Sequence, residues 1–272
     1  MSDITIRRMK FDFPKDLPTV FIEGEPEESY VNIALSLCLP YVEPYLIKTM
    51  RAAKPLVKDP KLAADLDKFC GQEGQHYKQH EAFNAVFRGR GFEDVVKLEQ
   101  QLEADYERFS TQKPLRFNLA YAEGFEAMTT VMACVFLEVD TSKWLPQPKD
   151  LMQWHLAEEF EHRTVAFDVY NHVTPGYFYR LAIGGFAQRH LVKFMLGVRD
   201  LFMKLDTASF EKYGGAEGRK ARMKKLDDRF MKIIMPRVSK SWTPWYSPHK
   251  LPVPPQMLEL AARYTKEAVG TS

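Results

Sequence analysis

The chain has 272 residues, of which 45% are hydrophobic and 27% are charged, so its composition excludes a disordered or low-complexity protein. The formal net charge of +2 gives no strong overall field, and we expect no nucleic-acid partner. The charge is uneven, because residues 176–250 carry 16 Lys and Arg against 6 Asp and Glu, a net charge of +10, whereas the remainder carries −8.

Hydrophobic periodicity predicts helices along the whole chain and no strand alternation longer than a few residues. An extended, proline-rich arm is expected over residues 1–25, and the acids that follow it favour a helix start. An irregular, Pro- and aromatic-rich stretch is expected over residues 242–255. Helices are predicted over residues 29–53, 60–88, 93–110, 116–140, 149–173, 177–205, 218–239 and 256–269. The predicted fold class is therefore all-α, most simply a helical bundle with additions.

Two prolines interrupt the first predicted helix, on either side of an acid. Pro40 and Pro44 each remove a helix hydrogen bond, so we expect a kink there. Glu43 lies between them and is the only acid inside that helix. A local rule broken at one place is often a functional feature, which makes Glu43 a candidate.

The most informative motif is Glu-x-x-His, which occurs as Glu73 with His76 and as Glu159 with His162. Residues three apart share one face of a helix, so both side chains of a pair can reach one metal ion. Further ligand types share these faces, since His80 follows His76 by four residues and His155 precedes Glu159 by four.

Single carboxylates on the other two helices would complete a known type of metal site. A dimetal site in a four-helix bundle takes one Glu from each of two helices and a Glu-x-x-His from each of the other two. Glu43 supplies the first, and the fourth predicted helix offers Glu123 and Glu126, which share a face. The complete order along the chain is more specific than either half of it.

This four-part order resembles the ferritin-like di-iron carboxylate superfamily. More narrowly, QEGQH at residues 72–76 and WHLAEEFEH at residues 154–162, followed by VAFDVY at residues 165–170, look like a bacterial family named "predicted metal-dependent hydrolase". The resemblance covers most of residues 26–205. It implies a ferritin-like four-helix bundle over residues 26–205, with residues 206–272 as a basic extension of additional C-terminal helices and irregular chain packed on it.

The resemblance also implies a set of ligands. The family's Pro-x-x-Glu matches Pro40 and Glu43, and its Glu-x-x-Thr matches Glu126 and Thr129, which favours Glu126 over Glu123. The spacing His-x-x-x-Glu-x-x-His at residues 155–162 is similar to that of the dimetal arylamine N-oxygenases, which use three histidines. The implied metal ligands are Glu43, Glu73, His76, Glu126, His155, Glu159 and His162, and the less favoured candidates are Glu123, His80 and Glu158.

Each candidate also has an interpretation without a metal. The Glu-x-x-His faces could be solvated helix surfaces with incidental ion pairs, and Glu43 could lie at a surface kink. His155 and His80 could be core histidines, or neighbours that hydrogen-bond to ligands. Asp168 could orient a ligand or form an ordinary salt bridge. The histidines that belong to no motif are His172, His190 and His249.

Mixed carboxylate and imidazole ligands suit iron or manganese. The resemblance implies two iron ions, or iron with manganese, and O2 as co-substrate. The main prediction is an O2-dependent oxygenase or oxidase that acts on a hydrophobic organic acid, aromatic or fatty, whose carboxylate the basic segment would hold. The alternatives are a dimetal hydrolase of an ester, amide or phosphate, and a non-enzymatic iron-handling protein.

Other features bear on compartment and partners. Cys38, Cys70 and Cys134 form no CxxC pair, and the N-terminus lacks the apolar region of a signal peptide. No run of 18 uncharged apolar residues predicts a spanning helix. We therefore expect a cytoplasmic monomer or homodimer, with peripheral contact at the inner membrane surface through the basic segment as an option. The electron donor is not identified by the sequence.

Overall fold

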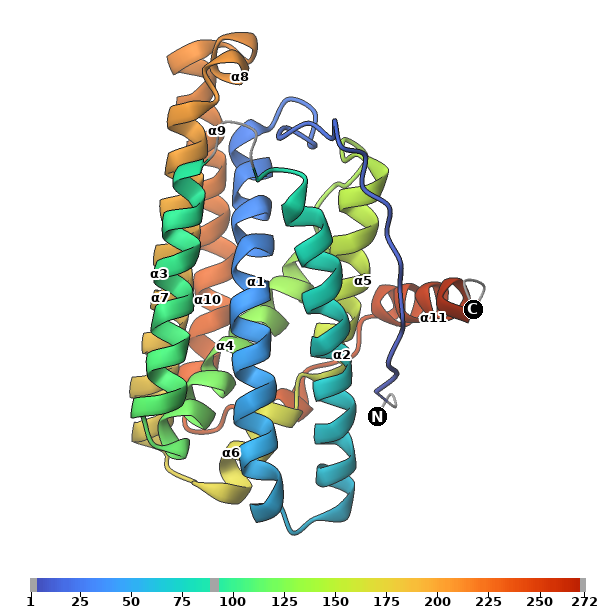
Figure 1. Ribbon diagram of the computed structural model, residues 1–272, viewed down its shortest axis with the longest axis vertical. Helices are drawn as coiled ribbons and strands as arrows, with labels where there is room; N and C mark the ends of the chain where they lie inside the picture. The colour runs from blue at the N-terminus through green and yellow to red at the C-terminus, as the bar shows by residue number, and fades with distance from the viewer. Residues whose placement is uncertain (1–3, 89–92, 270–272) are drawn as a thin grey trace.

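The computed structural model describes residues 4–88 and 93–269, and the regular elements of these residues are helices, which confirms the all-α prediction (Figure 1). An isolated β-bridge joins Ile22 to Trp144. The longer helices are α1 (Pro26–Ala53), α2 (Pro60–Ala85), α3 (Glu93–Gln112), α4 (Leu115–Phe136), α5 (Pro146–His162), α6 (Val165–Val173), α7 (Tyr177–Leu205), α9 (Gly215–Arg229) and α11 (Pro255–Val269). Shorter ones are α8 (Thr207–Lys212), α10 (Met235–Val238) and the turns Lys54–Leu56, Ser239–Trp242 and Pro248–Lys250.

The starts of the first two helices follow from local chemistry. Pro26 opens α1, where a missing N–H costs nothing, and Glu27 and Glu28 place negative charge in its first turn. Asp59 caps α2 by accepting hydrogen bonds from two backbone amides, with Pro60 at the first helical position. Helix α1 continues as one helix through Pro40 and Pro44, and the kink expected there stays a prediction.

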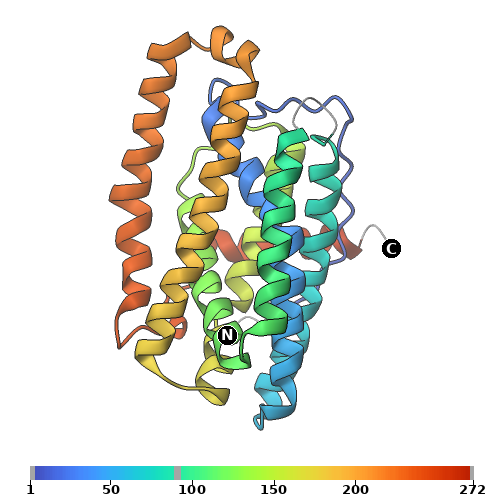
Figure 2. The same cartoon turned by 60° about the vertical axis from the view of Figure 1, so that its left-hand side comes forward.

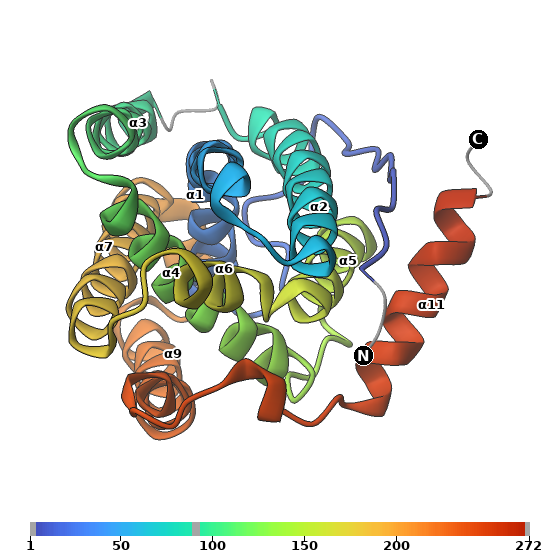
Figure 3. The ribbon, with the colours of Figure 1, turned by 90° about the horizontal axis from the view of Figure 1, so that it is seen from below.

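Helices α1, α2, α4 and α5 enclose the interior of the bundle, and α3 and α7 pack outside them (Figures 1 and 3). Helix α4 lies very close to α7, because a Cβ on Gly124 would lie only 2.2 Å from the Cα of Gly184. Two facing glycines therefore allow this approach. This four-helix arrangement is compatible with a ferritin-like bundle, which stays a prediction.

Three predicted helices differ from those observed. The helix predicted over residues 149–173 is two helices, α5 and α6, which separate at Arg163 and Thr164. The fourth predicted helix ends at Phe136 rather than at residue 140. The helix predicted over residues 218–239 contains the π-helical turn Phe230–Ile234, and α8 was not predicted.

The basic C-terminal segment lies against the acidic start of α1. Arg222 binds Glu27, and Arg229 binds Glu28. Figure 2 shows α9 and α10 running alongside α7. Part of the uneven charge seen in the sequence is therefore neutralised within the chain.

Helix α11 packs across the outer side of α5, close to the N-terminal arm (Figure 3). Arg7 of the arm donates a hydrogen bond to Thr265 of α11. One hydrophobic core includes Phe21 of the arm, the bundle helices and Tyr264 of α11. The division at residues 25 and 205 into arm, bundle and extension stays a prediction.

Among the described residues, one helix, Pro26–Leu56, is long and apolar enough to cross a membrane by composition. Its most apolar window is 72% buried inside the fold, as the central helix of a bundle is. The described cysteines are free, with Cys38 and Cys70 buried and Cys134 half-buried.

Candidate metal centre

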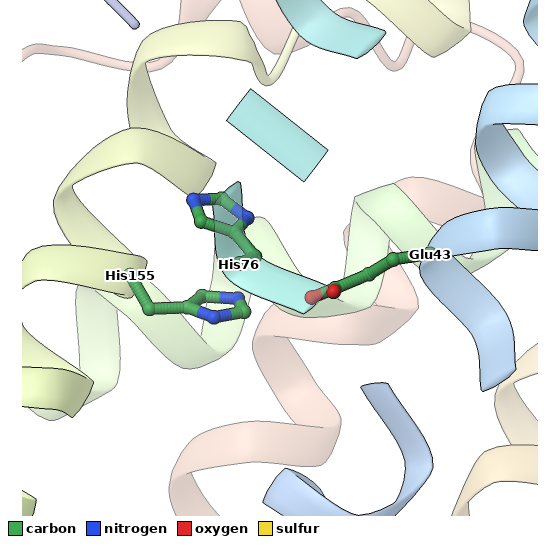
Figure 4. Close-up of side chains that lie close together, drawn as sticks. All are labelled: Glu43, His76 and His155. Carbon is green, nitrogen blue, oxygen red and sulfur yellow. The ribbon is translucent and has the colours of Figure 1, made fainter. Parts of the chain in front are cut away.

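Four helices bring the seven favoured residues to one place. Glu43 comes from α1, Glu73 and His76 from α2, Glu126 from α4, and the remaining three from α5. None of the seven residues is more than 4% exposed, so neither a solvated helix face nor a surface kink describes them. Figure 4 shows Glu43, His76 and His155 converging from their separate helices.

The donor atoms lie at distances that a metal pair could bridge. His162 Nε2 is 3.3 Å from Glu73 Oε1 and 3.4 Å from Glu126 Oε2. His155 Nε2 lies 3.0 Å from Glu159 Oε1. Two groups with no shared residue each place three donor atoms within 4.8 Å of one another. These groups are Glu43 with His76 and His155, and Glu73 with Glu126 and His162.

Most donor atoms in this cluster lack the hydrogen-bond partners that burial requires. Among the residues that the structure describes, nine buried atoms of the cluster have none. The atoms are both oxygens of Glu43, Glu73 and Glu126, Oε2 of Glu159, Nδ1 of His76 and Nε2 of His162. Because an unpaired buried polar atom costs about 1–3 kcal/mol, such a group of atoms fits a bound cation better than it fits a polar core.

Each histidine is held by its outer nitrogen, which leaves the other nitrogen facing the cluster. His76 Nε2 donates to Glu158 Oε2 at 3.0 Å, and His162 Nδ1 donates to Gln72 Oε1 at 2.9 Å. His155 Nδ1 lies 2.7 Å from His80 Nε2. Partners of this kind fix the tautomer and the ring orientation of metal-binding histidines.

The hydrogen bonds beyond His155 form a chain with one direction. If His155 Nε2 carries the lone pair that a metal needs, its Nδ1–H donates to His80 Nε2. His80 Nδ1–H then donates to Ser36 Oγ at 2.8 Å, and Ser36 donates to Asn84 Oδ1 at 2.7 Å. Every member of the chain is satisfied in this arrangement, which would leave His155 Nε2 available to a metal.

The N-terminal arm supplies a buried cation behind the cluster. Arg7 is 3% exposed and donates to Glu158 Oε1 at 3.0 Å and to Glu161 Oε1 at 2.6 Å. Gln72 also donates to Glu161, at 2.9 Å. Arg7 therefore braces the partners of both His76 and His162.

A family model described as "Predicted metal-dependent hydrolase" matches residues 5–251 of the chain. The chain belongs to this family. No curated protein and no solved structure gives a significant match. The matched region includes all seven clustered residues as well as Arg7, so the family extends over the arm and much of the basic segment.

Membership of a metal-dependent family agrees with the electrostatics of the cluster. Burial, with repulsion from Glu159, raises the pKa of Glu43 and Glu73 well above the ordinary value, and that of Glu126 to about 7. Burial also opposes the charge of Glu159, but His162 holds the pKa of that carboxyl well below its usual range. Without cations, Glu43, Glu73 and Glu126 therefore resist ionisation, whereas Glu159 does not.

The histidines differ in their electrostatics. Burial, with repulsion from His155, lowers the pKa of His76 well below the ordinary value, which favours the neutral form that metals bind. Burial also disfavours the charge of His162, but Glu159 and Glu126 raise its pKa well above the usual range. A cation that binds these carboxylates would compete with this proton.

The three less favoured candidates have other partners. Glu123 binds Arg180 at 2.9 Å, Glu158 lies between Arg7 and His76, and His80 lies between His155 and Ser36. Glu158 and His80 thus contact ligand candidates without joining a metal-sized group of the described residues.

The four residues named outside the motifs also have partners, since His172 Nε2 accepts a hydrogen bond from the backbone N–H of Lys58. Asp168 forms a salt bridge with His249, and His190 binds Tyr121. The sequence reasoning missed Arg7 and Gln72, and it left Glu161 as either a solvated residue or a neighbour of the ligands. Gln72 and Glu161 directly precede ligand candidates, which is a usable signal, whereas Arg7 lies in an irregular arm without any motif.

Proposed function

We propose that this protein is a dinuclear metal enzyme. Its ligands are Glu43, Glu73, His76, Glu126, His155, Glu159 and His162. The observation that carries the proposal is the set of orphaned, buried donor atoms that face one another from four helices. Because a polar core satisfies its own buried atoms, a bound cation pair is the simplest partner for these.

Charge supports two ions rather than one. The four carboxylates of the cluster carry four negative charges when ionised, and two divalent cations neutralise them if the three histidines are neutral. A single divalent cation would leave two negative charges uncompensated in a buried site, which is strongly unfavourable.

The donor types support iron, or iron with manganese. Carboxylate oxygens and imidazole nitrogens suit these metals, and no cysteine belongs to a metal-sized group of the described residues. The outer hydrogen bonds to Glu158, Gln72 and His80 would hold the three rings in place while the metals change charge.

We further propose O2-dependent oxidation of a hydrophobic organic substrate. The bound ions would supply the redox chemistry that reduces O2 and oxidises the substrate. The chain's own residues bury the centre and exclude bulk water from it.

Hydrolysis is the second candidate, and the description of the family favours it over oxidation. Two metal ions can lower the pKa of a bound water, which then attacks an ester, amide or phosphate. The seven ligands would be the same in both reactions, so the two candidates differ in the metal and in the need for O2.

Two experiments, one with O2 and one without it, test the reaction type. The chain is loaded with ferrous iron without O2, reduced, and mixed with O2 in a stopped-flow spectrometer. Oxidation predicts a new optical band within one turnover, with Glu159→Gln as the silent control. The zinc-loaded chain, assayed without O2 on a panel of esters, amides and phosphates, is expected to be inactive. Zinc-supported turnover without an optical change in the iron form would contradict oxidation and establish hydrolysis.

A further inference from the structure

An apolar cavity of about 400 Å³ lies between the bundle helices and the basic C-terminal segment. Its walls come from α1, α4, α5, α7 and α9, with the π-helical turn Phe230–Ile234 on one side. Its volume falls within the range of about 300–1,000 Å³ that is usual for ligand pockets. The basic C-terminal segment therefore covers a cavity of the bundle.

Two residues that line the cavity adjoin, in sequence, residues of the cluster or of its hydrogen-bond chain. Leu156 lines the cavity and directly follows His155. Leu35 lines it and directly precedes Ser36, which holds His80. We take the end of the cavity at Leu156 as its inner end, because this residue directly follows the ligand candidate His155.

The composition of the wall indicates the kind of occupant. Five of the chain's 12 methionines line the cavity: Met128, Met132, Met152, Met195 and Met223. Methionine is unbranched and adapts its shape, so this wall suits a flexible aliphatic chain better than a rigid ring. Phe230 and Ile234 of the π-helical turn also line it, and π-helical turns are frequent at functional sites.

The wall also carries four charged residues, which are Glu28, Arg199, Asp227 and Arg229. Arg199 lines the cavity and binds the neighbouring Asp200, whose side chain is 61% exposed. Such an exposed ion pair is weak, so a ligand carboxylate can share the guanidinium. Arg229 also lines the cavity, but buried Glu28 already holds it. Arg199 is therefore the better partner for an incoming anion.

We propose that this cavity binds a medium-chain aliphatic monocarboxylate, with its carboxylate at Arg199 and its methyl end toward Leu156. In this orientation the methyl end of the ligand, and not its carboxylate, would lie nearest the metal centre. That the ligand is also a substrate rests on the proposed function. The binding itself depends only on the cavity.

Isothermal titration calorimetry with sodium dodecanoate, below its micelle concentration, tests the binding. We expect saturable binding of one ligand per chain. Leu156→Trp fills the inner end and is expected to weaken binding at least tenfold, and Met132→Trp does the same from α4. Leu258→Trp, on an exposed position of α11, is the matched control and leaves binding unchanged. Binding that does not saturate would overturn the proposal. So would folded Leu156→Trp and Met132→Trp variants that bind dodecanoate as tightly as the unaltered chain does.

Two comparisons test the orientation. Arg199→Gln is expected to weaken dodecanoate at least fivefold and to leave dodecanol unchanged, with Arg108→Gln as the exposed control. The loss caused by Leu156→Trp is expected to grow from octanoate to dodecanoate, because only the longer chain reaches Leu156. If Leu156→Trp weakens the binding of octanoate and dodecanoate by the same factor, this orientation is overturned.

The metal content of the same samples separates this inference from the proposed function. If dodecanoate binds at Leu156 in a chain that takes up no iron or manganese, the dimetal proposal fails and the cavity proposal stands. If the chain binds two metals but no dodecanoate, the cavity proposal fails alone.

Discussion

Glu126 and Glu123 lie one turn apart on α4, and each is 2% exposed, yet their surroundings are opposite. Burial raises the pKa of both to about 7. Glu123 is paired with Arg180, which also donates to the backbone of Ser241. Neither oxygen of Glu126 has a hydrogen-bond partner among the described residues, and Oε2 lies 3.4 Å from His162 Nε2. Burial and pKa therefore do not separate a ligand candidate from a structural residue. The absence of hydrogen-bond partners for the carboxylate oxygens does.

The largest expected effect is on metal content. Glu126→Gln removes an anionic ligand, and we expect the iron content after loading to fall from about two ions per chain to fewer than one. Glu123→Gln is the matched control at the same burial on the same helix, and it is expected to keep both ions. Elemental analysis of the desalted protein measures this, and an unchanged content in Glu126→Gln would remove Glu126 from the ligand set.

The same two positions are expected to shift the stability of the metal-free chain in opposite directions. Glu123→Leu leaves Arg180 buried without its partner, which costs about 3–5 kcal/mol. Glu126→Leu removes an unpaired buried carboxyl and is expected to stabilise the chain by about 1–3 kcal/mol. Urea unfolding in the presence of a chelator gives both values. A loss of stability in Glu126→Leu would mean that the carboxyl has a structural partner after all.

Arg7 is expected to raise the metal affinity of the site although it is not itself a ligand. Arg7→Ala removes the partner of Glu158, which orients His76, and such outer contacts are typically worth about 10–100-fold in metal affinity. Arg8→Ala is the matched control, because Arg8 is exposed on the same arm. Competition with a chelating dye measures the affinity. Equal affinities in the two variants would show that the arm is not coupled to the centre.

The smallest expected effect is the pH dependence of the metal-free chain. The raised pKa values of Glu43 and Glu73, and that of Glu158 at about 8, mean that the folded state keeps protons that the unfolded chain releases. Stability therefore falls as pH rises. Below about pH 6.5 the lowered pKa values of His76 and His80 act in the opposite direction, so the fall is expected between about pH 6.5 and 8.

Thermal unfolding with a chelator, at intervals across that range, measures this fall. The metal-loaded chain is expected to lack it, because cations already hold the carboxylates in their ionised form. A midpoint that rises with pH in the metal-free chain would contradict the electrostatics of the cluster.

Whether a feature of the fold or the site could be predicted depends on how far apart in sequence the interacting residues lie. The spacings that join Glu73 to His76 and Glu159 to His162 are local, because residues three apart share a helix face, so they could be read from the sequence. The break between α5 and α6 could not, since Arg163 and Thr164 include neither proline nor glycine and the helix is interrupted without a local signal.

Contacts between segments that are distant in sequence were the hardest to predict. Arg7 reaches Glu158 across about 150 positions of sequence, and nothing in the arm marks it as buried. Whether Glu123 or Glu126 faces the cluster depends on Arg180 of α7, which occupies one of them. Patterns along the chain therefore predicted the ligand types and their order, while the residues that hold the ligands required the packed structure.

Anomalous diffraction at the iron edge, from crystals of the iron-loaded chain, tests the central claim most directly. The account predicts two peaks about 3.5–4 Å apart, enclosed by the side chains of α1, α2, α4 and α5. No peak there, or a single one with half of the carboxylates still unpaired, would contradict a dinuclear centre.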